Sequence, residues 1–215
     1  MGGDEIELVA RFISIYKDDL LPEQEAPDLG DLTEEDAEYA INHGGNTSGG
    51  ADLWKPRELK WLGKVFSKWL AVIFNMAEKG LGWPMGLRCA RSAYISKEEE
   101  PNIRDLLKYR VITVLPSVYR IWSNMRYRHF GDWSERWADE GQFSARKGRG
   151  AQEAWWTASL DAEVARTEEK AFAIPLFDMA KCYDMIPRRL AYAVLRSLGM
   201  PQRVLEAWRS YLEDL

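Results

Sequence analysis

The chain has 215 residues, of which 46% are hydrophobic, and a formal net charge of −5. This apolar content excludes a mostly disordered chain, because it is ample for a packed core. No apolar run approaches the roughly 20 residues that a membrane-spanning helix needs, and the first residues do not resemble a signal peptide. We therefore expect an intracellular protein, nuclear or cytoplasmic, without a membrane partner.

The charge is spread unevenly along the chain. Residues 1–40 carry a net charge of −11, residues 41–149 carry +8 and residues 150–215 carry −2. A basic central region is what binding to a phosphate backbone requires, although many proteins that never bind nucleic acid have a similar one. Cys89 and Cys182 are the only cysteines, and their spacing predicts neither a zinc site nor a disulfide framework.

Hydrophobic spacing predicts the elements of the first third. Apolar residues at helical spacing predict a helix over 5–17, followed by a solvated linker over 18–32 that is rich in acids, proline and glycine. Thr33 and Asp36 form the pattern of a capping box, which predicts a short helix ending before Gly44. The glycines of 44–50 fit either a plain linker or a close approach of the backbone to a partner.

The middle of the chain predicts helices around one hairpin. The clearest helical pattern covers 57–79, with one apolar face formed by Leu59, Leu62, Phe66, Trp69, Ile73 and Met76. Residues 86–97 and 109–115 look extended on either side of a charged turn, which predicts an antiparallel hairpin. Further helices are expected over 117–140, over 151–169, from Pro187 to Gly199 and after Pro201. Most tryptophans fall at helical spacing and are expected in the core, namely those at 122, 133, 137, 155, 156 and 208.

The most informative segment begins at Ala171. Its apolar run predicts a short buried strand that ends at Asp178. A buried lone carboxylate is very costly unless something pairs with it, and a bound cation is one such partner. An aspartate that caps the following turn is an equally good interpretation of this segment alone.

Several motifs, in order, resemble those of reverse transcriptases of the non-LTR retrotransposon (LINE-like) type. Asp178-Met-Ala-Lys181-Cys-Tyr183-Asp184 resembles the family's D-x-x-K-A-F-D palm motif. Four further segments lie upstream in the family's order. Gly44–Asp52 resembles its glycine-rich entry, and Pro84 with Ala93–Lys97 resembles its "P…I-P-K" strand. Tyr109–Ile121 resembles its "Y-R-P-I-S-L-L…Y-K-I" segment, and Gln142–Arg149 resembles its "Q-x-G-F-R-x-G-R-S" loop. Val111, Ser144 and Cys182 depart from the family pattern.

The resemblance implies an α+β fold: the fingers and partial palm of a right-hand polymerase, helix-rich with a short antiparallel sheet. It implies an acidic helical leader and linker over residues 1–43, a fingers-like region over 44–170 and the first part of a truncated palm over 171–215. In the family, a Y-x-D-D hairpin supplies the remaining metal-binding carboxylates, and it would follow Leu215. We therefore expect the chain to be inactive alone.

The resemblance also implies the chemistry of the complete enzyme. It would be an RNA-directed DNA polymerase, a nucleotidyltransferase that extends a DNA primer on an RNA template with deoxynucleoside triphosphates and Mg²⁺. Two magnesium ions can activate the attacking oxygen and hold the triphosphate in such a transfer, and carboxylate oxygens are the ligands that magnesium prefers. Asp178 would be the catalytic metal ligand, and the backbone carbonyl of Met179 would be a second, weaker ligand.

Other residues match the family's substrate contacts. Lys97 and Arg110 match residues that reach the triphosphate, where fixed cations stabilise developing charge. Tyr183 matches the aromatic beneath the incoming sugar, where a ring would clash with a 2′-hydroxyl. Template or primer phosphates would be bound by a basic, glycine-containing loop, at Arg146, Lys147 and Arg149.

Three alternatives remain open at this point. The chain fits a non-catalytic nucleic-acid-binding remnant that keeps a basic face. It also fits a helical interaction protein whose tryptophans serve a partner. An RNA-templated RNA polymerase would share the palm, but Tyr183 argues against it, because that enzyme must accommodate a 2′-hydroxyl.

Overall fold

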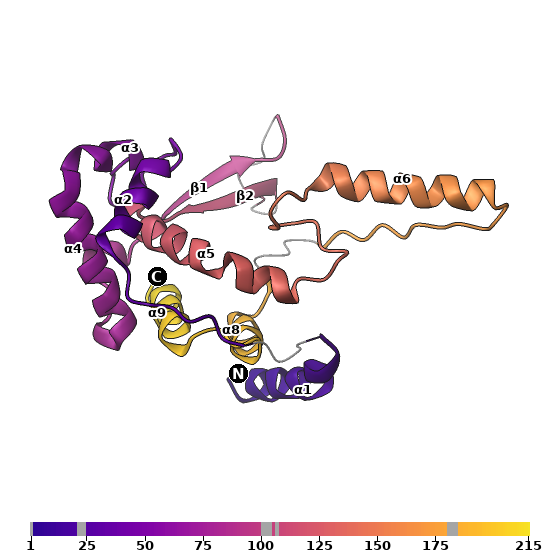
Figure 1. Cartoon of the computed structure of the whole chain (residues 1–215), viewed down its shortest axis with the longest axis horizontal. Coiled ribbons are helices and arrows are strands. Elements are labelled where there is room, and N and C mark those ends of the chain that lie inside the picture. The colour runs from indigo at the N-terminus through magenta and orange to yellow at the C-terminus, as the bar shows by residue number, and fades with distance from the viewer. Residues whose placement is uncertain (1, 21–24, 100–104, 106–107, 180–184) are drawn as a thin grey trace. The chain divides into compact units, whose positions relative to one another are not determined.

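The computed structural model describes residues 2–20, 25–99, 105, 108–179 and 185–215 (Figure 1). These residues form many helices and one two-stranded antiparallel sheet, which confirms the predicted α+β class. The chain divides into two compact units. The larger unit comprises residues 25–131 and 199–215, and the smaller unit comprises residues 1–24 and 132–198. Within the described ranges, no helix is both long and apolar enough to cross a bilayer.

Most elements belong to the larger unit. They are α2 (Glu34–His43), α3 (Pro56–Leu59), the 3₁₀ turn η1 (Lys60–Leu62), α4 (Gly63–Met76), the π turn η2 (Ala77–Leu81), the 3₁₀ turn η3 (Met85–Leu87), β1 (Arg91–Ser96), β2 (Tyr109–Val114), most of α5 (Ser117–Trp137) and α9 (Gln202–Glu213). The smaller unit contains the end of α5 together with α1 (Gly2–Leu20), α6 (Ala151–Thr167) and α8 (Arg188–Ser197). These bounds confirm the predicted hairpin and the helices predicted at both ends of the chain.

Helix α2 begins at the predicted capping box. The Asp36 backbone N–H donates to the Thr33 hydroxyl (3.1 Å), and the Thr33 backbone N–H donates to the Asp36 carboxylate (3.0 Å). The other carboxylate oxygen of Asp36 lies 3.3 Å from Nε2 of His129 on α5. Burial alone would raise the pKa of Asp36, but the hydrogen bonds from Thr33 and the nearby His129 together lower it below its usual value.

The single helix predicted over 57–79 is broken in the structure. Gly63 has a φ of 68°, in the region that favours glycine, and it separates η1 from α4. The predicted apolar face is wrong in part, because Trp69 and Met76 are 59% and 45% exposed. Apolar residues occur all round α4, so periodicity alone could not identify the face that packs. That face consists of Ser67, Leu70, Ala71 and Phe74.

An aromatic cluster forms the centre of the larger unit. Trp83 is 2% exposed, and its indole N–H donates to the backbone carbonyl of Ala207 on α9 at 2.8 Å. Its ring meets those of Tyr119, Trp122 and Tyr211 edge-on, with centroids 5.0–5.4 Å apart. Such edge-to-face pairs add stabilisation beyond the area they bury. The core position predicted for Trp122 is confirmed, whereas the central role of Trp83 was not predicted.

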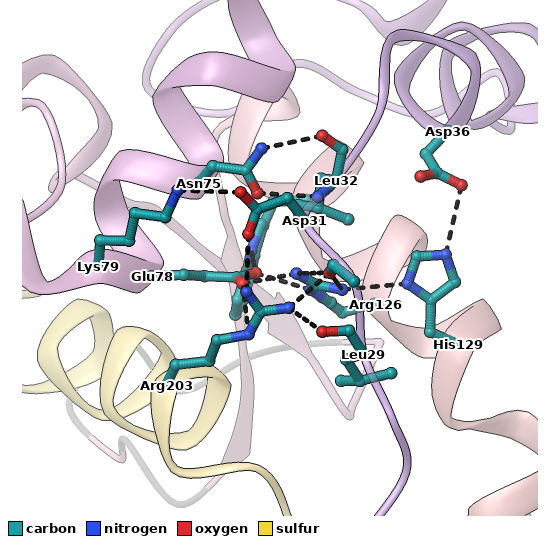
Figure 2. Close-up of polar contacts among 12 residues, drawn as sticks. Leu29, Asp31, Leu32, Asp36, Asn75, Glu78, Lys79, Arg126, His129 and Arg203 are labelled. Atoms are coloured by element: carbon teal, nitrogen blue, oxygen red, sulfur yellow. Dashed lines mark hydrogen bonds and ion pairs between the residues drawn. The ribbon is translucent and has the colours of Figure 1, made fainter.

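Glu78 and Arg126 form an ion pair inside the larger unit (Figure 2). Their side chains are 0% and 2% exposed. The Arg126 guanidinium donates to both oxygens of the Glu78 carboxylate, at 2.6 and 2.5 Å, and the Trp122 indole N–H donates to one of them at 2.9 Å. Arg126 also donates to the Gly30 carbonyl at 3.3 Å. This bidentate geometry compensates two charges that would be very costly to bury separately.

Residues 29–32, predicted as part of a solvated linker, lie against this ion pair (Figure 2). Leu32 is 3% exposed, and its backbone N–H and C=O both bond to the Asn75 side-chain amide at 2.8 Å. Asp31 accepts hydrogen bonds from Lys79 (2.9 Å) and from Arg203 on α9 (2.8 Å), which lower the pKa of its carboxyl. The linker prediction is wrong here, because distant side chains satisfy the polar groups of this segment.

Packing requires glycine at two positions of the 44–50 segment, Gly49 and Gly50, and the tighter contact is at Gly50. A Cβ atom at Gly50 would lie 2.4 Å from the Leu115 carbonyl oxygen and 2.7 Å from the Pro116 nitrogen. Only glycine allows the two backbones to approach this closely. Of the two interpretations left open by the sequence, close approach is therefore the correct one at Gly50, and the neighbour is the chain's own junction between β2 and α5.

In the smaller unit, α1 contacts α8. Trp133 is 4% exposed, and its indole N–H donates to the Leu198 carbonyl at 3.2 Å, so its predicted core position is confirmed. Trp155 and Trp156 on α6 are 75% and 65% exposed, and their predicted core position is wrong. Helical spacing shows which residues share a face, but it does not show whether another element covers that face.

Removing the cation that neutralises Glu78 should destabilise the larger unit strongly. Arg126→Met leaves the buried Glu78 carboxylate with the Trp122 indole and with Arg203 at 3.7 Å, and losing one partner of a buried pair costs roughly 3–5 kcal/mol. The double variant Glu78→Leu/Arg126→Met removes both charges and should be more stable than Arg126→Met. Urea denaturation followed by tryptophan fluorescence measures these differences in the free energy of unfolding. The control is Lys79→Met, which breaks an exposed pair with Asp31 and should cost at most ~1 kcal/mol. Equal losses in Arg126→Met and Lys79→Met would contradict this prediction.

The capping box should make stability depend on pH through Asp36. Asp36→Asn is expected to lower the free energy of unfolding by about 1 kcal/mol at neutral pH. Because the folded-state pKa of Asp36 lies below its usual value of 3.8, the ionised carboxylate stabilises the fold above that value. The stabilisation begins to be lost below the usual value of 3.8 and disappears as the pH falls through the lower folded-state pKa, where wild type and variant should converge. Denaturation curves at several pH values test this, with Glu35→Gln in the same helical turn as the control. A difference that grows as the pH falls would refute it.

Candidate nucleic-acid interface

The predicted hairpin is present, with a regular antiparallel register. Strand β1 pairs with β2 from Arg91 opposite Val114 to Ser96 opposite Tyr109. Strand β2 is rich in the β-branched and aromatic residues that favour a pleated surface, and β1 contributes Tyr94 and Ile95. The register is continuous over six residue pairs, so it defines which side chains share a face of the sheet.

The hydrogen bonding between the two strands continues by one residue pair, Lys97 with Lys108, towards the turn. The backbone N–H of Lys97 donates to the Lys108 carbonyl at 2.9 Å. The Lys108 ammonium donates to the Glu98 carboxylate, and this hydrogen bond raises the pKa of Lys108. Lys108 is therefore partly neutralised by its own hairpin.

Four cations of the hairpin share one face, and one of them, Lys108 opposite Lys97, is paired with Glu98. Arg110 lies opposite Ile95 and therefore shares its face, and strand alternation places Lys97 and Arg91 on that face too. Diagonal neighbours across two strands are about 7–8 Å apart, within reach of long side chains. The structure thus brings together Lys97 and Arg110, the two residues predicted to contact a triphosphate. Arg91 was not predicted, although alternation from Lys97 would have indicated it.

Both faces of the hairpin are accessible in the described structure. Ile95 and Ile112 are 49% and 44% exposed beside the cations, and Tyr94 and Val111 are 61% and 51% exposed on the other face. A guanidinium can bind two phosphate oxygens at once, whereas a lysine acts as a point charge. Two arginines and one lysine on the same accessible face can therefore bind a phosphate-rich ligand.

The base of the hairpin is held by the segment that follows Gly50. The hydroxyl of Ser117 donates to the Trp54 carbonyl at 2.5 Å, and the backbone N–H of Val118 lies 3.4 Å from the Asp52 carboxylate. Together with the close contact between Gly50 and Leu115, these bonds fix the start of α5. The hairpin therefore projects from a rigid base.

The basic loop predicted to bind nucleic acid lies in the smaller unit. Arg146 donates to the Glu135 carboxylate (2.9 and 3.0 Å) and to the Asp139 carbonyl (2.8 Å), and its side chain is only 12% exposed. Arg149 donates to the Glu140 carbonyl. Lys147 is exposed, and its ammonium has no ion pair within the described residues. Arg146 thus serves mainly to hold the loop, and contacts of Lys147 and Arg149 with nucleic acid stay predictions.

The strand predicted to end at Asp178 is not formed. Residues 170–179 have no regular secondary structure, and Leu176 and Phe177 are 91% and 89% exposed. A strand needs a neighbour to satisfy its backbone hydrogen bonds, and the two described strands pair with each other. Asp178 and Met179 lie in this exposed segment, and Tyr183 falls outside the described residues.

The described residues do not contain a group of three His, Cys, Asp or Glu side chains placed to hold a metal ion. A Y-x-D-D sequence does occur at Tyr16-Lys17-Asp18-Asp19, which sequence reasoning missed. It lies ahead of Asp178 in the chain and within helix α1, whereas the family motif is a hairpin that follows the first palm motif. We therefore assign it no metal-binding role.

Comparison of the chain with known protein families found no matching family, and a search of curated proteins found none that matches.

Proposed function

We propose that the chain binds the phosphates of nucleic acid or of deoxynucleoside triphosphates through the basic face of its hairpin. We further propose that it is a fingers-and-palm portion of a reverse transcriptase of the non-LTR type. The observation that carries the binding proposal is the register of β1 and β2, which places Arg91, Lys97 and Arg110 on one accessible face.

The charges of this face support a phosphate ligand. Arg91 and Arg110 are exposed, and neither has an ion pair with another described residue. Lys108, by contrast, is paired with Glu98. Exposed cations such as these two arginines attract a polyanion over a distance set by the ionic strength, and most of the affinity comes from counterion release. Residues 41–149, which contain the hairpin, carry a net charge of +8.

The described residues do not fit a two-magnesium centre. Asp178 offers one carboxylate, and no further described side chains join it in a group of three ligands. Two divalent cations require several hard oxygen ligands at fixed positions. For this reason we propose only that the chain binds phosphate groups, and we assign it no catalytic step.

A non-catalytic binding remnant is a second candidate. The specific observation that favours it is that Asp178 lies in an exposed segment without regular secondary structure, whereas the basic hairpin is formed. Binding that is unchanged in Asp178→Ala and decreases with salt would agree with this candidate.

Arg110→Ala should weaken binding to an RNA–DNA duplex severalfold. Because one phosphate contact is lost, the slope of log affinity against log salt should fall by about one. Fluorescence anisotropy of a labelled duplex, measured at several salt concentrations, gives both quantities. Lys68→Ala is the control, because it removes an exposed cation of the same unit that is not on the hairpin. Equal effects of the two substitutions would contradict the assignment of the hairpin, and no affinity at low salt would favour the helical interaction protein.

The isolated chain should not incorporate deoxynucleotides in a primer-extension assay with Mg²⁺. The physical reason is that a single carboxylate cannot hold two cations. The assay requires an active polymerase on the same primer and template as a positive control. Robust incorporation by the 215-residue chain, abolished by Asp178→Ala, would refute this prediction and establish a metal centre.

A further inference from the structure

A small polar pocket lies where α2, the α3–η1 segment and α4 meet in the larger unit. Its volume is about 80 Å³, and its polar lining comes from Glu38, Asn42, Lys60, Gly63, Lys64 and Ser67. Pockets that bind drug-sized molecules are typically about 300–1,000 Å³. This pocket can therefore hold a single small ion or one phosphate group, but it is too small for a nucleoside.

The charge of the lining favours an anion. Lys60 is held at the pocket by a hydrogen bond of 2.8 Å to the Asn42 carbonyl at the end of α2. Lys64 has no ion pair within the described part of the chain. Glu38 is the one carboxylate of the lining, so the two lysines leave a net positive charge.

The pocket also lies at the start of α4, a helix of 14 residues. Gly63 breaks the preceding turn, and no side chain caps the new helix. The first backbone N–H groups of a helix lack intrahelical acceptors and carry a partial positive charge, which makes them donors for an anion.

Ser67 provides an independent sign of a missing ligand. The residue is 3% exposed and lines the pocket, yet its hydroxyl has no hydrogen-bond partner among the residues that the structure describes. Its oxygen is not among the fully buried polar atoms that lack a partner, so the hydroxyl faces the space of the pocket. There it can donate a hydrogen bond to a ligand oxygen.

From these features we infer that the pocket binds a tetrahedral phosphate group, held by Lys60, Lys64, the Ser67 hydroxyl and the N-terminus of α4. The group is either free phosphate or one phosphate of a nucleic-acid backbone. This site is separate from the hairpin face, and its existence does not depend on the proposed function.

Isothermal titration of the full chain with inorganic phosphate in chloride buffer tests the inference. Saturable binding is expected, and Lys64→Met should weaken it roughly tenfold, because a charge-assisted hydrogen bond is lost. Lys68→Met is the matched control, since Lys68 lies one turn further along α4 and does not line the pocket. No binding by the wild type, or equal effects of both substitutions, would overturn the inference.

Ser67→Ala separates a binding role from a structural one. It should weaken phosphate binding, but it should not lower the melting temperature of the phosphate-free protein, because no hydrogen bond within the protein is lost. A lower melting temperature without phosphate would show that the hydroxyl has a partner inside the protein, and the inference would fail.

A short single-stranded oligonucleotide without terminal phosphates distinguishes the two sources. If its affinity falls in Lys64→Met but not in Lys68→Met, the pocket binds a backbone phosphate. If both substitutions leave it unchanged while Lys64→Met still weakens phosphate binding, the ligand is the free ion. Oligonucleotide binding that depends on Arg110 and not on Lys64 would show that the pocket does not bind a backbone phosphate.

Discussion

The larger unit depends on one buried interaction, the ion pair between Glu78 and Arg126. Two charges inside a core are stabilising only if their geometry is nearly ideal and the remaining donors and acceptors are satisfied. Here the Trp122 indole and the Gly30 carbonyl supply further hydrogen bonds, and Arg203 lies 3.7 Å from the Glu78 carboxylate. Because each partner comes from a different part of the chain, the pair fixes the positions of η2, of α5 and of the 29–32 segment relative to one another.

This arrangement has consequences for the candidate interface. The ion pair and the aromatic cluster hold α5, and α5 follows directly from β2 through the tight contact at Gly50. The orientation of the hairpin base is therefore set by core packing. The arginines divide accordingly: Arg126 and Arg203 bond to groups within the larger unit, whereas Arg91 and Arg110 lie on the accessible sheet face. The same residue type thus serves the fold in one place and is available to a ligand in the other.

Local features of the structure could be predicted from the sequence, and long-range ones could not. The capping box of Thr33 and Asp36 and the β1–β2 hairpin involve neighbours in sequence, so their patterns suffice. The sharing of a face by Lys97 and Arg110 follows from the register. The role of residues 29–32 depends on Asn75 and Arg203, which are 43 and more than 170 residues away. The 171–177 run is apolar enough for a buried strand, but a strand also needs a partner, which its own sequence does not contain.

The charge pattern, too, could be interpreted only in part from the sequence. Residues 1–40 carry a net charge of −11 and residues 41–149 carry +8, which suggests an acidic leader beside a free basic surface. In the structure, however, Asp31 pairs with Lys79 and Arg203, and Asp36 contacts His129. Part of the basic charge is therefore neutralised by the leader's own acids. Net charge over a segment consequently overstates the attraction for a polyanion. The quantity that matters is the number of cations that share a surface and have no carboxylate partner, and this number depends on the strand register and on the helix positions.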